Sequence, residues 1–274
     1  MVLSFHPLIK GDVNRLCAGR EPDPADVAAI RNARAVVLPQ GCPSGLYRAA
    51  RDNCAHVFPN YDARFAFPGK IGQIRLFRST GVTYPPTEIF ENTAAYERSR
   101  CSGFNLHIPS VFKFDWGGEG ETVFLVEDHA TMEDLLRHAK RCESTGQSGF
   151  LLQHYVPCGG RSMRVVVIGR SLVSYWRVQE SGSFHTGISH GGRVDARSDP
   201  DLMMRAEATV LEFCSRTGIN LAGIDLIFDA ERPQADPFLL EINYFFGRTG
   251  LGGSQAYYRL LRREVGTWLR SLPA

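Results

Sequence analysis

The feature that most constrains the fold is a pair of apolar segments near the C-terminal end, each interrupted by a carboxylate. Residues 222–228 read AGIDLIF and residues 237–243 read PFLLEIN, with the turn DAERPQAD between them. Short segments rich in aliphatic residues and bounded by turns are typical of β-strands. Glu241 and Asn243 are two residues apart, so they share one face of their strand. A hairpin of these strands places Asp225 beside both.

Carboxylates inside apolar strands need a positive partner, because burying an isolated charge is costly. Asp225, Glu241 and Asn243 together offer two carboxylates and an amide oxygen. Such an oxygen-only set suits Mg²⁺ (or Mn²⁺) and is poor for zinc. The alternative is that Asp225 and Glu241 form salt bridges with nearby arginines. The grouping of three oxygen ligands favours a metal completed by substrate phosphates.

The rest of the chain predicts an α+β protein. Residues 1–69 contain a short βαβ pattern, with strands at 35–39 and 55–59 around a helix at 46–53. The loop Gln40–Ser44 follows the carboxyl end of the first strand, where sites of α/β units gather. Helical patterns follow at 71–80 and 91–101, and residues 108–127 predict a hairpin. Thr131 and Asp134 predict a capping box that opens the next helix.

The last third predicts mostly antiparallel sheets with two long helices. Residues 150–156, 163–169 and 171–178 predict three strands, and apolar residues at helical spacing from Met203 to Phe213 predict a helix. A final helix buries Tyr257, Leu261, Val265 and Trp268.

Composition excludes several classes of partner. The chain has 274 residues with 31 basic and 29 acidic side chains, a net charge of +2, so no strong field predicts nucleic acid or a membrane surface. No apolar run approaches the roughly 18–20 residues of a transmembrane helix, and the N-terminus lacks a signal-peptide pattern. Seven scattered cysteines without a Cys-x-x-Cys pair predict reduced thiols in a cytoplasmic protein.

A nucleotide site is predicted without the common phosphate-binding motifs. Neither G-x-x-x-x-G-K-[ST] nor a G-x-G-x-x-G after a strand is present. Lys113 instead lies near the end of VFKFD and is followed by Gly-Gly-Glu-Gly at 117–120. A lysine on a strand and a glycine loop beyond it can hold phosphates. The glycines fit a plain hairpin turn equally well.

These motifs occur together in an order that resembles the ATP-grasp superfamily, and most of all its RimK-like glutamate-ligase branch. The resemblance runs from residue 70 to the end of the chain and rests on Lys113, the glycine loop, residues 153–156, Arg164, Asp225 and Glu241-x-Asn243. It implies an ATP-grasp fold in which two α+β subdomains, 70–149 and 150–274, sandwich ATP behind a small α/β domain at 1–69. It also implies carboxylate–amine ligation through an acylphosphate.

The resemblance assigns roles residue by residue. Residues 153–156 match the hinge whose backbone meets adenine, with His154 where the family usually has glutamate. Arg164 matches an arginine that faces the transferring phosphate, and Arg177 falls near a second. Catalytic roles are thus implied for Arg164, Lys113 and Arg177, and metal ligation for Asp225, Glu241 and Asn243. The implied nucleotide-binding residues are Lys70, Lys113, Gly117, Gly118, Gly120, Gln153, His154, Tyr155 and Val156.

The chain departs from the family pattern at three further places. Ser162 stands where relatives often have an acid, and in the segment 182–192 Gly187 and His190 replace an asparagine and an arginine, so no catalytic role is assigned there. After Asn243, the residues Tyr244-Phe245-Phe246-Gly247-Arg248 replace Ser-Pro-Gly. These aromatic residues fit either the core or an altered acceptor pocket. Arg248 is a candidate to hold a substrate carboxylate, the alternative being a pair with a surface acid.

The sequence therefore predicts an ATP- and Mg²⁺-dependent ligase for small-molecule or peptide carboxylates and amines. One alternative is an ATP-grasp kinase that stops after phosphorylating its substrate. Another is a non-catalytic nucleotide-binding module. The identity of the substrates and the oligomeric state do not follow from the sequence.

Overall fold

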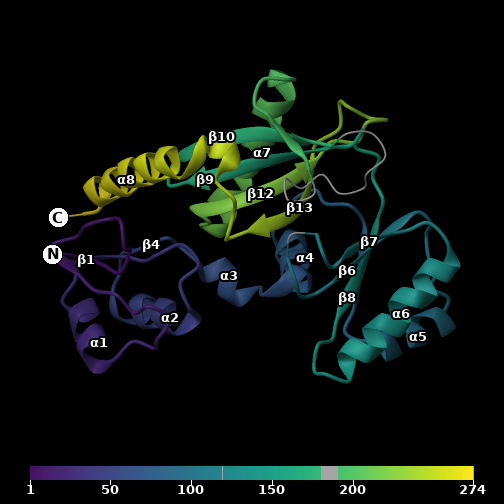
Figure 1. Ribbon diagram of the computed structural model, residues 1–274, viewed down its shortest axis with the longest axis horizontal. Coiled ribbons are helices and arrows are strands. Elements are labelled where there is room, and N and C mark those ends of the chain that lie inside the picture. Colours follow the sequence, from purple (N-terminus) through teal and green to yellow (C-terminus); the bar gives the residue numbers. More distant parts are fainter. Residues whose placement is uncertain (119, 180–190, 274) are drawn as a thin grey trace.

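The computed structural model describes residues 1–118, 120–179 and 191–273, which form three sheets flanked by helices (Figure 1). One sheet belongs to the N-terminal part, one to the middle and one to the C-terminal part. All described pairings after residue 100 are antiparallel, as the sequence predicts.

The N-terminal unit is a parallel sheet of short strands in the order β2-β1-β3-β4, with β1 (Val2–Ser4), β2 (Val13–Asn14), β3 (Ala35–Val37) and β4 (Val57–Phe58). Helices α1 (Pro24–Arg31) and α2 (Ser44–Asn53) pack with it around buried Leu3, Val36 and Leu46. The predicted βαβ unit is confirmed as β3-α2-β4, whose strands pair in parallel. The strands β1 and β2 and helix α1 had no counterpart in the sequence prediction.

The middle of the chain begins with α3 (Asp62–Ala66) and α4 (Gly69–Thr80) and builds the sheet β5-β8-β6-β7. Its strands are β5 (Thr87–Phe90), β6 (Ser110–Phe114), β7 (Val123–Val126) and β8 (Phe150–His154). Helices α5 (Thr93–Cys101) and α6 (His129–Glu143) cover one face (Figure 1). The core between them is rich in phenylalanine, and the rings of Phe112 and Phe150 stack with centroids 4.6 Å apart.

The predicted start of α6 at a capping box of Thr131 is wrong. The helix begins at His129, and Asp128 is its N-cap, whose carboxylate accepts a hydrogen bond of 2.7 Å from the Thr131 amide. Thr131 therefore supplies the third amide of the helix. Asp128 lies three residues before that amide, the spacing at which a side-chain oxygen reaches an unpaired donor of the first turn.

The C-terminal sheet has the order β11-β10-β9-β12-β13 and positions the candidate site. It comprises β9 (Arg161–Ile168), β10 (Ser171–Val178), β11 (Arg193–Asp195), β12 (Leu221–Ile227) and β13 (Phe238–Asn243). Helix α7 (Pro200–Thr217) packs on one face, and α8 (Gly253–Ser271), reached through the 3₁₀ turn η2 (Thr249–Leu251), packs on the other. Both faces are apolar where a helix covers them.

The face under α8 becomes polar beyond the reach of that helix. Val166, Ile168 and Leu221 pack with α8, whereas Arg164 and Asp225, further along the same strands on the same face, do not belong to that core. Residues an even number of positions apart on a strand share a face, so this face changes from apolar to polar within β9 and within β12. A polar surface is thereby left in the middle of an otherwise buried sheet.

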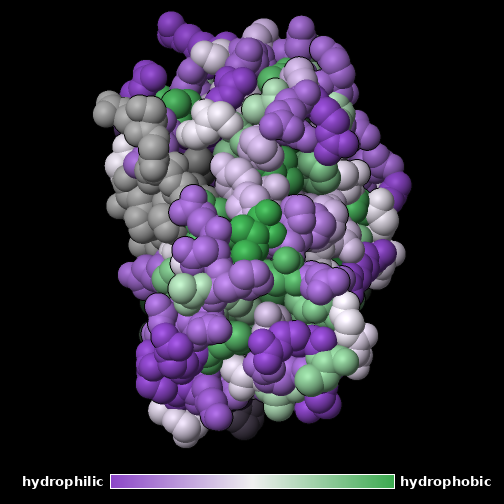
Figure 2. Space-filling model, turned by 90° about the vertical axis from the view of Figure 1, so that its right-hand side faces the viewer, coloured by the Kyte–Doolittle hydropathy of each residue, from purple (hydrophilic) through white to green (hydrophobic). Residues whose placement is uncertain are grey.

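The N-terminal unit lies beside α8, and the sheet of the middle part lies at the opposite end of the molecule (Figure 1). That opposite end is mostly hydrophilic, with small hydrophobic areas along its centre (Figure 2). Among the described residues, no helix is both long and apolar enough to cross a membrane. Strand β8 pairs with β5 and β6 of the middle sheet. The domain division at residues 69/70 and 149/150 stays a prediction.

Candidate active site

Three charged side chains form a row across neighbouring strands of the C-terminal sheet. Asp225 on β12 lies opposite Arg164 on β9 and opposite Glu241 on β13. Directly opposite residues point to the same face of a sheet and have Cβ atoms roughly 5 Å apart. The predicted hairpin, with Asp225 beside Glu241, is therefore confirmed. Asn243 lies two pairs further along, opposite Gly223.

Asp225 is held by two arginines and the neighbouring amide. Its oxygens accept from Arg164 Nε at 2.6 Å and Nη2 at 2.7 Å, and Arg177 Nη2 lies at 3.1 Å. Asn243 Nδ2 donates to Asp225 Oδ2 at 3.1 Å. Burial alone would raise the pKa of Asp225, which is only 4% exposed, but the charges and hydrogen bonds of the two arginines hold it below its ordinary value. Asp225 is ionised in this arrangement.

Glu241 has a different environment although it is the direct neighbour of Asp225. Within the described part of the chain, no basic side chain lies at salt-bridge distance from its carboxylate, which is half-buried. The alternative that arginines neutralise both carboxylates is thus true of Asp225 and not of Glu241. A half-buried carboxylate without an ion-pair partner is a place where a cation is stabilised.

The backbone between the two ligand candidates of β13 is fixed by a residue that the sequence did not reveal. Gln73 on α4 donates from Nε2 to the carbonyl of Ile242 at 3.0 Å and accepts from the amide of Ile242 at 2.8 Å. Because β13 is the edge strand of its sheet, these backbone groups have no partner strand. Gln73 therefore supplies the pairing and fixes Glu241 and Asn243 on either side.

Lys113 lies on β6, across from the acidic row. Its Nζ donates to Gln153 Oε1 at 2.7 Å. Burial lowers the pKa of Lys113 to about 8, and the nearby charge of Glu241 opposes this shift, whereas Lys70 adds to it. Lys113, Lys70 and Glu241 are therefore close enough to influence one another, although the two lysines are 43 residues apart in the sequence (113 − 70).

Lys70 holds the glycine loop. Its buried ammonium lies 3.1 Å from the carbonyl of Trp116, 3.2 Å from that of Gly117 and 3.4 Å from Thr122 Oγ1. Burial lowers the pKa of Lys70, against the opposing charges of Glu241 and Asp115. Gly117 has a φ of +78°, in the left-handed region that favours glycine. Glu119 lies outside the described residues.

Asp115 is a second residue that the sequence did not reveal. Its Oδ1 accepts from the amide of Ile71 at 2.7 Å, at the start of α4. Gly69 lies so close to this carboxylate that a Cβ atom there would collide with it. Asp115 thereby fixes the helix turn that carries Lys70. A helix start favours a carboxylate because its first amides are unpaired.

The arrangement concentrates positive charge around two carboxylates. Four cations, on α4, β6, β9 and β10, face Asp225 and Glu241. Within the described ranges, no group of three or more His, Cys, Asp or Glu side chains is placed to hold a metal. The oxygen donors available here are two carboxylates and the Asn243 amide. Such a surplus of cations suits a polyanionic ligand.

Comparison with known proteins decides the family. The sequence model of the RimK-like ATP-grasp domain matches residues 69–255. The chain belongs to the RimK-like ATP-grasp family.

Individual relatives of this RimK-like chain are distant. A protein of Vibrio cholerae serotype O1 named probable alpha-L-glutamate ligase is 26% identical over 145 residues, which cover 52% of this chain and 44% of that protein. The match thus spans less than half the length of the curated relative. A RimK domain ATP-grasp protein from Sphaerobacter thermophilus has a TM-score of 0.66 at 18% identity, covering 96% and 98% of the two chains.

A third similar structure is N5-carboxyaminoimidazole synthetase from Staphylococcus aureus in complex with ADP. Its TM-score is 0.59 at 10% identity, covering 89% of this chain and 63% of that one. Together these structures show that the chain has the ATP-grasp fold, which confirms the predicted fold class.

The predicted hinge of this RimK-like domain, residues 153–156, starts with the last two residues of β8. Gln153 is 2% exposed, and its side chain bridges Lys113 and Thr87, donating to Thr87 Oγ1 at 2.9 Å. The His154 amide donates to the carbonyl of Pro86 at 2.8 Å, and its ring stacks on that of His107 at 4.5 Å. Tyr155 and Val156 continue beyond the strand. Their contact with adenine stays a prediction, whereas the side chain of Gln153 serves Lys113.

One departure from the family pattern, Ser162, lies beside the acidic row. Ser162 Oγ accepts from Arg177 Nε at 3.1 Å and Nη2 at 2.9 Å, so it positions the second arginine. Gly187 and His190 lie outside the described residues. Arg248 has no acidic partner in the part of the chain that the structure describes. Its guanidinium lies over the rings of Tyr257 and Tyr258, at 4.8 and 4.6 Å, and the surface-acid alternative finds no support.

Proposed function

We propose that the protein is an ATP- and Mg²⁺-dependent ligase that joins a carboxylate to an amine through an acylphosphate. The observation that carries this proposal is the row Arg164–Asp225–Glu241, faced by Lys113 and Lys70. It offers acidic oxygens for a cation and a surplus of basic groups for phosphates within one polar surface.

The basic groups would bind the triphosphate. Lys70 already lies against the glycine loop, and Lys113 on β6 lies near enough to Glu241 to interact with its charge. Arg164 and Arg177 hold Asp225. Phosphate oxygens accept charge-assisted hydrogen bonds as strongly as a carboxylate does. Nucleotide binding would therefore let the arginines exchange part of their bonds with Asp225 for bonds with phosphate.

The oxygen donors fit magnesium. Glu241 lacks an ion-pair partner among the described residues. Asn243 donates from Nδ2 to Asp225, so the Oδ1 atom of Asn243 is not engaged by that carboxylate. Asp225, Glu241 and Asn243 would hold the ion, which supplies charge neutralisation at the β- and γ-phosphates when bound. The exchange described above would release Asp225 for this role.

The reaction needs positioning and charge neutralisation more than a nucleophilic side chain. A substrate carboxylate oxygen attacks the γ-phosphorus, and the bond to the β,γ-bridging oxygen breaks to release ADP. The nitrogen of the amine then attacks the acyl carbon. The carbon–oxygen bond to phosphate breaks, inorganic phosphate leaves, and the nitrogen loses a proton. Lys113, Arg164 and Arg177 would neutralise the charge that develops on the phosphoryl oxygens.

The names of the relatives agree with this proposal. The Vibrio cholerae protein is named a probable alpha-L-glutamate ligase, and the Staphylococcus aureus structure contains ADP. We therefore expect small-molecule or peptide carboxylates and amines as substrates, with neither nucleic acid nor a membrane as partner. The cytoplasmic location stays a prediction.

The test is a screen of amino acids and short peptides for ADP release with Mg·ATP, followed by mass spectrometry of the products. A ligase yields ADP, phosphate and a product lighter by one water than its two substrates. Phosphorylated substrate without dependence on amine identifies the kinase, and absence of ADP release with every compound identifies the binding module. Glu241→Gln is the matched control and should release no ADP. Turnover that survives in this variant contradicts the metal assignment.

A further inference from the structure

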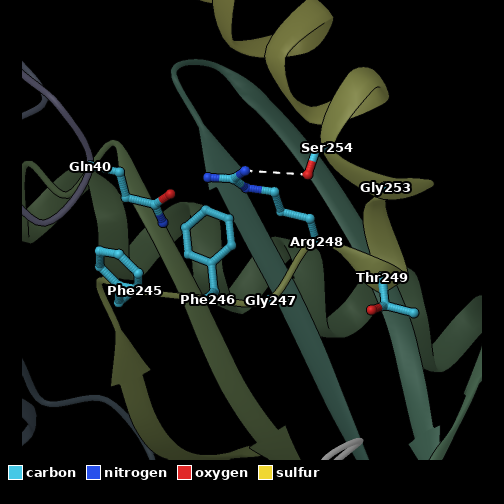
Figure 3. Close-up of a pocket in the computed structure, with 8 residues that line it drawn as sticks. All are labelled: Gln40, Phe245, Phe246, Gly247, Arg248, Thr249, Gly253 and Ser254. Carbon is cyan, nitrogen blue, oxygen red and sulfur yellow. Dashed lines mark hydrogen bonds between the residues drawn. The ribbon is translucent and has the colours of Figure 1, made fainter. Parts of the chain in front are cut away.

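A cavity of about 560 Å³ lies between the N-terminal unit and the segment that follows β13. Gln40 comes from the loop after β3, and the remaining lining residues lie between β13 and the first turn of α8 (Figure 3). This segment replaces the family's Ser-Pro-Gly. The polar and apolar groups that line the cavity are Gln40, Phe245, Phe246, Arg248, Thr249 and Ser254.

The polar side of the cavity favours an anion. Arg248 is half-buried, and its Nη1 donates to Ser254 Oγ at 3.3 Å, which is a long hydrogen bond. Among the residues that the structure describes, no carboxylate lines the cavity. The rings of Tyr257 and Tyr258 hold the plane of the Arg248 guanidinium in place. Its remaining N–H donors are therefore already oriented, and less conformational entropy is lost when they bind a ligand. A planar guanidinium of this kind matches a carboxylate through paired hydrogen bonds.

Gln40 adds a second donor from the N-terminal unit. Its Oε1 accepts from the Tyr257 hydroxyl at 3.0 Å, and its Nε2 donates to the carbonyl of Tyr244 at 3.3 Å. An amide nitrogen carries two donors, so one N–H remains for a ligand. Figure 3 shows the side chains of Gln40 and Arg248 extending toward each other across the ring of Phe246.

The opposite side of the cavity is aromatic. Phe246 is buried against Tyr257, with ring centroids 5.9 Å apart, whereas Phe245 is 75% exposed. The ring of Phe245 lies directly against Gly41, where any Cβ atom would overlap it. An exposed phenylalanine whose ring packs against the backbone offers an apolar wall. Ligand pockets commonly combine such walls with few polar groups.

The cavity adjoins the proposed phosphoryl-transfer site. A Cβ placed on Gly223 would lie 3.2 Å from Phe246 Cβ and 3.4 Å from Arg164 Cδ, so these two side chains meet over Gly223. Gly223 precedes Asp225 by two residues, which is roughly 7 Å along a strand. The reacting carboxylate must lie at the γ-phosphate, whereas Arg248 lines the adjoining cavity, so Arg248 is placed to hold a different group.

We infer that this cavity binds the amine substrate as an amino acid or short peptide with a free carboxylate and an apolar side chain. Arg248 and Gln40 hold the carboxylate, Phe245 and Phe246 contact the side chain, and the amine faces the row of Asp225 and Glu241. This inference rests on the proposed ligase function. It gives the N-terminal unit a role in substrate selection through Gln40 and Gly41.

The test measures binding by calorimetry, so it does not require turnover. The full chain, with ADP and Mg²⁺ present, is titrated with L-leucine, L-leucyl-L-leucine and glycylglycine, and with the C-terminal amide of each leucine compound. We expect at least one leucine compound to bind, and the amide to bind roughly tenfold more weakly, because a hydrogen-bonded charge is lost. Binding of leucine itself identifies a single amino acid, and binding of the dipeptide alone identifies a peptide.

Three variants locate the interaction. Arg248→Gln should lower the affinity for the free acid to that for its amide and leave the affinity for the amide unchanged. Arg248→Lys should lower the affinity for the acid roughly tenfold, because lysine lacks the paired donors. Arg270→Lys, at the far end of α8, is the matched control. Phe245→Ala should weaken the leucine compounds more than glycylglycine, whereas Leu211→Ala, an exposed apolar residue of α7, should change neither.

The inference is overturned if no free acid binds, if acid and amide bind equally, or if the difference between them persists in Arg248→Gln. The proposed ligase function fails separately. Glu241→Gln should lose ADP release and retain the acid–amide difference, since Glu241 does not line the cavity. A chain that binds the leucine acid through Arg248 but never releases ADP keeps the cavity assignment and refutes the ligase.

Discussion

Replacing each carboxylate of the acidic pair by its amide should separate the stability of the site from its chemistry. Asp225→Asn and Glu241→Gln are equally small changes at directly opposite positions of one ladder. Both should abolish ATP hydrolysis, because each removes a proposed metal ligand. Only Asp225→Asn should destabilise the fold, because Asp225 alone has two arginine partners.

The magnitude follows from burial. The side chains of Arg164, Arg177 and Asp225 are 12%, 11% and 6% exposed, so the amide at position 225 leaves two largely buried guanidinium groups without a counter-charge. Removing one partner of a buried ion pair typically costs about 3–5 kcal/mol. For a chain of this size that lowers the melting temperature by at least about 6 °C. Glu241→Gln should change it by about 2 °C or less, since no ion pair is lost.

The assay is thermal unfolding of the nucleotide-free chain, with hydrolysis of ATP measured on the same preparations. A third variant, Asp225→Asn with Arg177→Gln, should recover part of the lost stability because one unpaired cation is removed with the carboxylate. Equal melting temperatures for the two single variants refute the reasoning. A stabilised Asp225→Asn would show that repulsion between the carboxylates outweighs their pairing with arginine.

Three further predictions concern other parts of the molecule. ATP affinity should fall as the pH rises above about 8, because the lowered pKa of Lys113 leaves its amine neutral above that pH. Arginine keeps its charge, so Lys113→Arg should abolish this fall when Kd is measured against pH. Gly250→Ala should lower the free energy of unfolding, measured by urea denaturation, by about 1–3 kcal/mol, because a Cβ atom there overlaps the buried Tyr175 ring. Gly247→Ala, which has open space around it, should lower it by less than about 1 kcal/mol. The free energy of unfolding should fall by at most about 3 kcal/mol as the pH decreases from 6.5 toward about 4. In the folded chain, burial and the nearby Arg248 lower the pKa of His6 to about 4, whereas the unfolded chain takes up the proton near pH 6.5. His6→Gln should remove this part of the pH dependence.

The local pattern of the sequence determined most of the C-terminal half. The two apolar segments that contain Asp225 and Glu241 predicted two strands, and the turn between them predicted their pairing. These are short-range properties, because side-chain alternation and hairpin connection depend on residues close in the chain. The strands β1 and β2 were missed, whereas the equally short β3 and β4 were predicted from the apolar segments 35–39 and 55–59 that contain them.

The order of the motifs also determined the family, but not the partners of its residues. Lys113, residues 153–156, Arg164, Asp225 and Glu241-x-Asn243 appear in sequence as an ordered set. Nothing in that order shows that Gln153 bridges Lys113 and Thr87, or that Asp115 fixes the helix of Lys70. These contacts depend on how a helix start and several strands meet in space.

Only the tertiary structure decided which carboxylate is neutralised and which is left for a cation. Arg164 reaches Asp225 because β9 lies beside β12, although the two residues are 61 positions apart. Glu241 is one strand further from Arg164, on the edge strand β13, and Gln73 of α4 fills the edge that a sixth strand would otherwise occupy. Likewise Gln40 meets Tyr257 across 217 residues. The order of the strands in a sheet depends on how the whole molecule buries its apolar faces. No local pattern in the sequence therefore determines which strands become neighbours.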